Sequence, residues 1–366
     1  MALAERTYNF SAGPATIPLK VLEQIQQELL NFNNCGASIM EISHRSAQFI
    51  EVLDSARNGI KQLLGIDDSH EVLFLQGGSR LQFSMIPMNL LRSSDDRAAY
   101  IVSGTWSGKA YDEALGTGSI DLVWNGKESN YNTLPNEVDL TLPEDPAFLY
   151  YASNETIHGV QFQSGLQIDS TPLVCDASSD FLSRPIEMSR HGIVYACAQK
   201  NAGPSGVTIV VIRKDLLQRS QDSLPGYLNY KKHVEQNSMF NTPPTFGIYV
   251  IDLICKWLLH DMGGLEQVAT FNQEKANLLY DVINECQDMF IGHAVKEFRS
   301  NMNVTFNLPS DELTAQFVEQ ATAKGLTSLK GHRSVGGIRA SIYNAMPREG
   351  VLALRDFMKA FYTQNS

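Results

Sequence analysis

Residues able to do chemistry follow several candidate strands of this chain. The run Val72–Leu75 leads into Gly77-Gly78-Ser79-Arg80 and then into a helical stretch. A glycine-rich turn that opens a helix presents backbone N–H groups and the positive end of the helix dipole to an anion. Arg80 adds a charge-assisted donor. The segment is therefore typical of a phosphate site, although a Gly-Gly turn is also ordinary loop structure.

A carboxylate and an amine follow two other candidate strands. Asp176 comes directly after an apolar run, and Lys200 lies between another such run and a turn rich in glycine and proline. A charge at the end of a buried strand is costly unless it is paired, and desolvation favours the neutral, nucleophilic form of a lysine. The plainer alternatives are that Asp176 caps a helix and that Lys200 extends into water.

Trp106 follows the candidate strand at residues 98–102, and on its own it is best interpreted as a packing residue. Together, however, the phosphate turn, the acid, the lysine and the aromatic ring match what pyridoxal phosphate requires. The lysine forms a Schiff base with the cofactor aldehyde, and the acid keeps the pyridine nitrogen protonated so that the ring accepts electrons.

The elements that must position these residues alternate between short apolar runs and helical patterns. Most of the runs are continuously apolar, which is typical of strands covered on both faces in a mainly parallel sheet. We therefore predict an α/β fold with a mainly parallel seven-stranded sheet and helices at 18–32 and from Ser46. The seven predicted strands are Glu71–Leu75, Ala98–Val102, Ser119–Trp124, Ala147–Ser153, Pro172–Cys175, Gly192–Ala198 and Val207–Ile212.

The pattern changes after about residue 258. A long helical pattern (264–290), an alternating strand (302–308), a helix (311–324), a glycine-rich strand pair (328–343) and a last helix (348–362) indicate a smaller α+β domain. We predict an N-terminal segment at 1–16 that contributes to the active site and to the small domain. The large cofactor-binding domain is predicted at 17–258 and the small C-terminal domain at 259–366.

Composition and charge narrow the class of protein. The 366 residues are 43% hydrophobic, and 29 Lys+Arg against 40 Asp+Glu give a net charge of −11, which argues against nucleic acid or an anionic membrane as a partner. Five cysteines without paired spacing indicate free thiols in a reducing compartment. The chain lacks metal-binding motifs and an uncharged apolar run near the ~20 residues of a membrane span. We expect a soluble, cytoplasmic protein without a metal.

The sequence also resembles the phosphoserine aminotransferase family within the class V aminotransferases, over essentially the whole chain. The resemblance implies a pyridoxal-phosphate-transferase fold similar to that of aspartate aminotransferase, with a homodimer that shares its active sites. The motifs that carry it are Asn9–Ala15, Ile42–Ser46, Gly77–Arg80, Ser153–Gly159, Asp176–Ser179, Gln199–Pro204, Asn241–Pro244 and Gly331–Ser341.

The resemblance implies a role for each residue around the cofactor, pyridoxal 5′-phosphate. Lys200 is the Schiff-base lysine, Asp176 pairs with the pyridine nitrogen, and Trp106 stacks on the ring. Thr156 forms a hydrogen bond near the phenolic oxygen of the cofactor. The residues implied for the cofactor phosphate are Ser79, Arg80 and Gln199, with Asn241 and Thr242 reaching it from the second subunit.

The resemblance also implies the substrates. Arg339 binds the α-carboxylate, Ser11 lies beside the bound amino acid, and His44, Arg45, His332 and Arg333 surround the phosphate of phosphoserine or the distal carboxylate of glutamate. Apart from the resemblance, the arginines in these motif loops indicate a small dianionic substrate, because a guanidinium binds a carboxylate or phosphate through two hydrogen bonds. The expected reaction is reversible transamination of O-phospho-L-serine with 2-oxoglutarate, giving 3-phosphooxypyruvate and L-glutamate in serine biosynthesis.

Three alternatives stay open at this point. The chain could act on 4-phosphooxy-L-threonine in pyridoxine biosynthesis as well. It could be another class V enzyme, such as an alanine–glyoxylate-type aminotransferase or a cysteine desulfurase, although Cys175, Cys197 and Cys286 lie in predicted strands and a helix rather than in a mobile loop. It could also be a non-catalytic scaffold of the same fold, which cofactor binding would distinguish.

Overall fold

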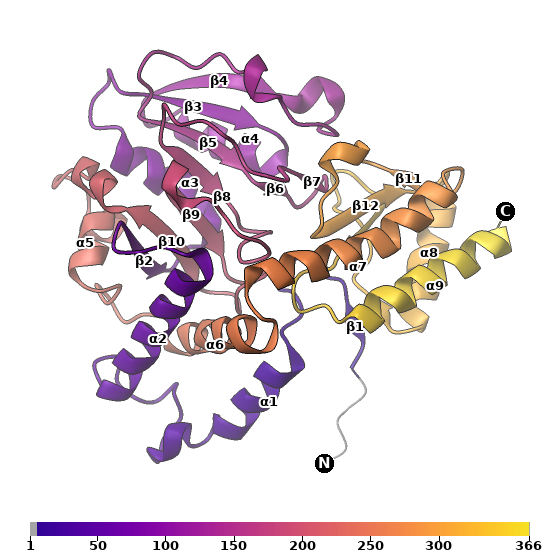
Figure 1. The fold of residues 1–366 in the computed structure, drawn as a ribbon, viewed down its shortest axis with the longest axis horizontal. Coiled ribbons are helices and arrows are strands. Elements are labelled where there is room, and N and C mark those ends of the chain that lie inside the picture. The colour runs from indigo at the N-terminus through magenta and orange to yellow at the C-terminus, as the bar shows by residue number, and fades with distance from the viewer. Residues whose placement is uncertain (1–5, 366) are drawn as a thin grey trace.

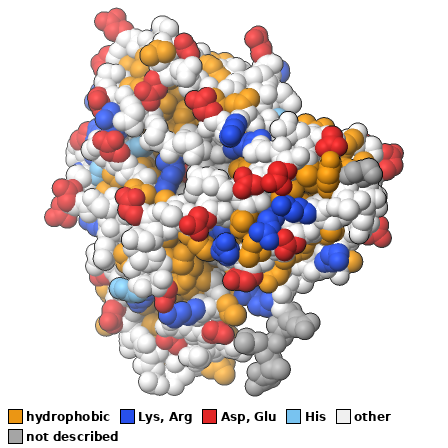
Figure 2. Space-filling model, turned by 45° about the vertical axis from the view of Figure 1, so that its right-hand side comes forward, with side chains coloured by type: hydrophobic (Ala, Val, Ile, Leu, Met, Phe, Trp, Pro, Cys, Tyr) orange, Lys and Arg blue, Asp and Glu red, His pale blue; other side chains and the backbone are white. Residues whose placement is uncertain are grey.

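The computed structural model describes residues 6–365, so residues 1–5 of the predicted N-terminal segment and Ser366 of the predicted small domain lie outside the described residues. Figure 1 shows a larger lobe built on one sheet and a smaller lobe that holds the C-terminal elements. Acidic and basic side chains are interspersed over the face that Figure 2 shows. None of the described helices is both long and apolar enough to cross a membrane.

The larger lobe contains the predicted seven-stranded sheet. Its strands are β2 (His70–Leu75), β3 (Arg97–Val102), β4 (Ser119–Asn125), β5 (Phe148–Ala152), β8 (Leu173–Asp176), β9 (His191–Cys197) and β10 (Thr208–Arg213). The spatial order is β2-β10-β9-β8-β5-β3-β4. Only β10 runs antiparallel to its neighbours in this sheet. The fold prediction is confirmed, and each predicted strand boundary lies within one residue of the observed one.

Helices cover both faces of this sheet, which explains the continuously apolar runs. Helices α2 (Ala47–Leu64) and α6 (Thr245–Lys256) pack on one face, and α3 (Gly78–Leu90) and α4 (Thr105–Ala114) pack on the other. Alternate residues of each strand enter opposite cores: Phe74 joins the first and Leu73 the second. Helix α1 (Leu19–Glu28) precedes α2, and the short α5 (Tyr230–Glu235) precedes α6.

The smaller lobe is built on a three-stranded antiparallel sheet. Its order is β11 (Ile291–Gly292), β12 (Asn303–Asn307) and β14 (Ile338–Ser341). Helices α7 (Leu265–Glu285), α8 (Asp311–Ala323) and α9 (Arg348–Asn365) complete the lobe. Strand β1 (Tyr8–Asn9) pairs in parallel with β13 (Leu326–Thr327), so the start of the described chain joins this lobe.

The predicted strand pair at 328–343 is present only as a short antiparallel contact, and the main partner of its second strand lies elsewhere. Within that range only β14 is a strand, and it pairs with β12; a single bridge joins Lys330 to Ile338. Gly336 and Gly337 have φ values of 76° and 65°, in the left-handed region that breaks an extended strand. Arg339 N donates to Leu329 O and Gly331 N donates to Gly337 O, both at 2.8 Å, so the first arm pairs with β14 over one bridge and does not extend into a strand.

Helix α7 connects the two lobes. Leu265 and Val268 belong to the core of the large lobe, whereas Leu279 and Ile283 belong to the core of the small one. The helix therefore packs on both sides, and the residue at which the predicted domains divide stays a prediction.

We expect the small core to depend on Phe317. Its side chain is fully buried, with ring centroids of Phe357 and Phe361 at 4.9 and 5.2 Å. Phe317→Ala should lower the free energy of unfolding of this lobe by about 3–5 kcal/mol, because the cavity stays unfilled. Denaturant unfolding followed by circular dichroism measures the loss. Phe240→Ala is the control, because Phe240 is 43% exposed. Equal losses in both variants would contradict the assignment of this core.

Candidate active site

A cavity of about 350 Å³ lies where several strands of the large sheet end. Its walls come from the turns after β2, β3, β5, β8 and β9, together with the segment after β1 and the region around β14. This is the edge at which open α/β sheets bind ligands. The polar and charged residues in its lining are Ser79, Arg80, Trp106, Asn154, Thr156, Asp176, Ser178, Ser179, Gln199, Lys200, His332 and Arg339.

One wall of the cavity is the turn that opens α3. Gly77 has φ 92°, and a Cβ there would lie 2.5 Å from the side chain of Leu81, so glycine is required. The hydroxyl of Ser79 lies 2.7 Å from that of Ser178, which comes from the turn after β8. Two hydroxyls and the first N–H groups of α3 therefore converge on one place, which suits an anion such as phosphate.

Lys200 lies half-buried in the same cavity. Its Nζ donates a hydrogen bond to Thr156 Oγ1 at 2.7 Å and lies 5.5 Å from the centroid of the Trp106 ring. The chain after β1 covers the lysine: a Cβ on Gly13 would lie 3.2 Å from Lys200 Cγ, and Ala15 N donates to Gln199 O at 2.9 Å. The amine is therefore held between a hydroxyl and an aromatic face.

Asp176 lies at the end of β8 and is 5% exposed. Its Oδ1 accepts the N–H of Ser178 at 2.9 Å, and its Oδ2 accepts the hydroxyl of Tyr195 at 3.0 Å. Burial raises the pKa of this carboxyl, while the bonds from Ser178 and the charge of Lys200 act in the opposite direction. The side chain is thus a desolvated acid that faces an amine across one cavity.

Glu155 is a fully buried carboxylate that the sequence analysis did not assign. It accepts hydrogen bonds from Trp106 N at 3.1 Å, Ser107 N at 2.7 Å and Ser107 Oγ at 2.6 Å. Burial raises the pKa of Glu155, and the N-terminus of α4 stabilises its anion. A Cβ on Gly104 would lie 2.4 Å from Glu155 Cδ, so glycine is required there too. Glu155 therefore fixes the helix turn that carries the Trp106 ring.

The matching family model is the one for class-V aminotransferases, and it matches residues 7–354. The chain belongs to the class-V aminotransferase family.

Several known members of the family are similar over nearly their whole length. A protein named phosphoserine aminotransferase from Rhodopirellula baltica is 54% identical, over 99% of this chain and 96% of its own. The solved phosphoserine aminotransferase of Bacillus circulans subsp. alkalophilus is 46% identical with a TM-score of 0.97, over 99% of this chain and all of its own. The solved phosphoserine aminotransferase of Trichomonas vaginalis, with pyridoxal phosphate bound, is 40% identical with a TM-score of 0.92. The match covers 97% of this chain and 100% of that one.

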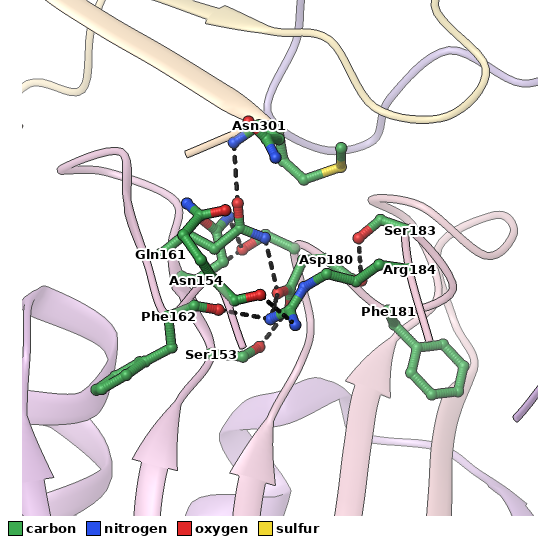
Figure 3. Close-up of polar contacts among 12 residues, drawn as sticks. Ser153, Asn154, Gln161, Phe162, Asp180, Phe181, Ser183, Arg184 and Asn301 are labelled. Carbon is green, nitrogen blue, oxygen red and sulfur yellow. Dashed lines mark hydrogen bonds and ion pairs between the residues drawn. The ribbon is translucent and has the colours of Figure 1, made fainter. Parts of the chain in front are cut away.

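In this class-V aminotransferase, a polar network fixes the turn after Asp176 (Figure 3). The buried carboxylate of Asp180 accepts hydrogen bonds from Ser153 Oγ and from Gln161 Nε2, the latter at 3.0 Å. Arg184 Nη2 lies 3.4 Å from the same carboxylate. Gln161 Oε1 in turn accepts the N–H of Asn301 at 2.9 Å, from the smaller lobe. The turn is thereby tied both to its own sheet and to the second lobe.

A second buried contact ties the strand of Arg339 to the cavity. Asn154 Nδ2 donates to Asn303 Oδ1 at 2.8 Å, and Asn303 in β12 is the partner of Ser341 in β14. Arg339 lies on β14, half-buried, and burial lowers the pKa of its guanidinium, which nevertheless stays charged. The guanidinium is therefore carried by a strand that cannot shift without breaking a buried amide pair.

The structure brings together nine of the predicted site residues and leaves six outside the cavity lining. The nine are Ser79, Arg80, Trp106, Thr156, Asp176, Gln199, Lys200, His332 and Arg339. Ser11 is next to Ala12, which lines the cavity, and Arg333 is next to His332. The other four lie on two surface turns, where Arg45, Asn241 and Thr242 are exposed and His44 is half-exposed.

Sequence reasoning did not assign the lining residues Asn154, Ser178 and Ser179. It also missed Glu155 and Tyr195, which lie next to the site. Glu155 lies between Asn154 and Thr156 of a motif that was found, and its signal is a carboxylate directly after a buried strand, the same signal that identified Asp176. Tyr195 had no signal, because it is one apolar residue among others in the strand 192–198.

We expect Glu155→Gln to destabilise the protein before any cofactor is added. The amide nitrogen cannot accept the N–H of Trp106 or Ser107, so a buried donor loses its partner at a cost of about 1–3 kcal/mol. Denaturant unfolding of the cofactor-free protein measures the difference. The matched control is Asp112→Asn, an exposed carboxylate on α4, the helix whose first turn Glu155 contacts, for which we expect a change within about 0.5 kcal/mol. Equal unfolding free energies in the two variants would rule out the anchoring role of Glu155.

Proposed function

We propose that this chain binds pyridoxal phosphate in the cavity and transfers the amino group of O-phospho-L-serine to 2-oxoglutarate, giving 3-phosphooxypyruvate and L-glutamate. The observation that carries the proposal is the meeting of Lys200 and Asp176 with an anion-binding turn and an aromatic face in one cavity. The relatives named phosphoserine aminotransferase, at up to 54% identity, support the choice of substrate. This reaction belongs to serine biosynthesis.

The residues present fit this cofactor. A cavity of about 350 Å³ falls within the usual range of small-molecule sites, roughly 300–1,000 Å³. Among the described residues, the buried Trp106 Nε1 and Asn154 Oδ1 have no hydrogen-bond partner, although both residues line the cavity. Such atoms are costly unless a ligand or water satisfies them. Bound pyridoxal phosphate would supply a carbonyl that exchanges amines and a protonated ring that stores the electron pair released at Cα.

The side chains divide the remaining work. Lys200 would hold the cofactor through Nζ, and as a free amine Nζ would move the substrate Cα proton as a general base. Thr156 Oγ1, 2.7 Å away, keeps Nζ close to its starting position. Asp176 would keep the ring nitrogen protonated, and Ser79, Arg80 and Gln199 would hold the phosphate. The second half-reaction uses the same groups in reverse.

Arg339 is the proposed partner of the substrate α-carboxylate. Its planar guanidinium binds a carboxylate through two parallel hydrogen bonds, which a lysine cannot do. His332 lines the same cavity and lies on the turn that precedes β14, so it is placed to meet the far end of the substrate. Both phosphoserine and glutamate present an α-carboxylate and a distal anion, so one arrangement serves both.

We propose that a second copy of the chain completes the site. His44, Arg45, Asn241 and Thr242 are hydrogen-bond donors on surface turns, outside the cavity of their own chain. Leu30 is 85% exposed and Met40, close to His44 in the sequence, is 55% exposed. Large exposed apolar side chains are typical of a surface that another protein covers. We also propose a cytoplasmic location, because all five cysteines are free thiols. For the domains we keep the predicted boundaries, with the N-terminal segment ending at residue 16 and the large domain at residue 258.

A half-reaction assay tests the proposed function. Wild-type protein incubated with pyridoxal phosphate should acquire visible absorbance, which phosphoserine and glutamate should change much faster than alanine. The response to 4-phosphooxy-L-threonine decides whether the pyridoxine intermediate is also a substrate. Lys200→Ala should lose both the absorbance of the lysine-bound cofactor and the activity. A wild type that does not bind the cofactor, or a preference for alanine, would contradict the proposal.

Subunit mixing tests the shared site. Arg45→Ala should raise KM for phosphoserine at least tenfold with little effect on cofactor binding, because a charge-assisted contact worth about 2–4 kcal/mol is lost. A mixture of Arg45→Ala and Lys200→Ala subunits should regain activity at low phosphoserine, since one site of each hybrid then has both native residues. Failure of the mixture to recover, with hybrids demonstrated by mass spectrometry, would place Arg45 in its own subunit's site.

A further inference from the structure

Two buried tyrosines extend from Asp176 into the core of the large lobe. The hydroxyl of Tyr195 donates to Asp176 Oδ2 at 3.0 Å, and the hydroxyl of Tyr150 lies 2.9 Å from that of Tyr195. The three residues come from adjacent strands β9, β8 and β5, where Tyr195 is the register partner of Asp176. Tyr195 is 0% and Tyr150 is 1% exposed. The carboxylate thus ends a row of hydroxyls that starts in the core.

The direction of these hydrogen bonds follows from the number of protons. An ionised carboxylate can only accept, and a tyrosine hydroxyl has one hydrogen. Because Tyr195 gives its hydrogen to Asp176, Tyr150 must donate to the oxygen of Tyr195. Burial raises the pKa of both phenols well above the ordinary value, so both keep their protons. Both hydroxyls therefore point toward Asp176, and such aligned bonds strengthen one another in a low-dielectric interior.

Packing alone does not explain the two hydroxyls. The surroundings are apolar side chains such as Val174 and Val210, and the ring of Tyr100 stacks on that of Tyr150 with centroids 4.8 Å apart. Phenylalanine would fill the same space without the desolvation of two buried hydroxyls. The charged group that this row of hydroxyls reaches is Asp176, where Tyr195 donates to Oδ2 and Ser178 N donates to Oδ1.

We propose that Tyr195, supported by Tyr150, is a positioning residue for the transamination. Its hydrogen bond fixes the plane of the Asp176 carboxylate and keeps it an anion, so that the carboxylate retains the proton on the ring nitrogen of the cofactor. Lys200 and Glu155 are the other charged groups that act on Asp176, one favouring and one opposing its charge. This role rests on the proposed function of the cavity.

Tyr195→Phe tests the role with the holoenzyme. We expect kcat to fall by about 10- to 100-fold, the equivalent of one hydrogen bond to a charged group, while KM for phosphoserine changes less than about threefold because the substrate contacts remain. With pyridoxal phosphate labelled with ¹⁵N in its ring, the nitrogen resonance should move toward that of unprotonated pyridine. The dissociation constant of the cofactor should rise. Tyr150→Phe should shift each measurement in the same direction by a smaller amount.

Tyr100→Phe is the matched control, because this tyrosine is equally buried and stacks on Tyr150 but lies outside the row of hydroxyls. It should keep the wild-type kcat and ¹⁵N resonance whatever it does to stability. Values for Tyr195→Phe that equal those of Tyr100→Phe would overturn the proposal. If Tyr195→Phe does not fold, wild-type values in Tyr150→Phe would overturn it instead. A wild type that fails to bind pyridoxal phosphate would be a failure of the proposed function, not of this role alone.

Discussion

The site depends on keeping one carboxylate charged at the end of a buried strand. Asp176 is 5% exposed, and burial by itself favours its neutral form. The protein opposes this with donors from two directions, the backbone of the following turn and the hydroxyl of Tyr195. Hydrogen bonds between Asp180 and its partners, shown in Figure 3, hold this turn after Asp176 in place. Much of the polar structure beneath the cavity therefore stabilises a single anion.

The local features of the fold could be predicted from the sequence because they leave local signals. A strand buried on both faces is apolar throughout, and a reactive residue directly after it breaks that pattern; Asp176 and Lys200 were found in this way. Glu155 and Tyr195 act through partners that lie 48 and 19 positions away, and no spacing in a single sequence indicates such contacts. The main partner of β14 was missed for a related reason, since β12 comes from before α8, whereas the adjacent glycine-rich segment contributes a single bridge.

The same buried contacts explain why the two lobes form one site. The amide pair of Asn154 and Asn303, and the bond from Asn301 to Gln161, cross from the large lobe to the strands that carry Arg339. Unpaired amides in the interior are costly, so rotation of the small lobe would have to break several bonds without water to replace them. These contacts therefore help to fix the position of Arg339 relative to Lys200.

This rigidity applies to only one end of the substrate. The proposed partners of the reacting end are Lys200 and Arg339 for the substrate and Asp176 for the cofactor, and all three lie on or within three residues of a strand. The proposed donors for the distal anion, among them Arg45 and Arg333, lie in exposed turns, where side chains adapt at low cost. A tetrahedral phosphate and a planar carboxylate differ in shape and in distance from Cα. A fixed reacting end with adaptable cationic loops at the other end allows one site to alternate between them, as a two-substrate exchange requires.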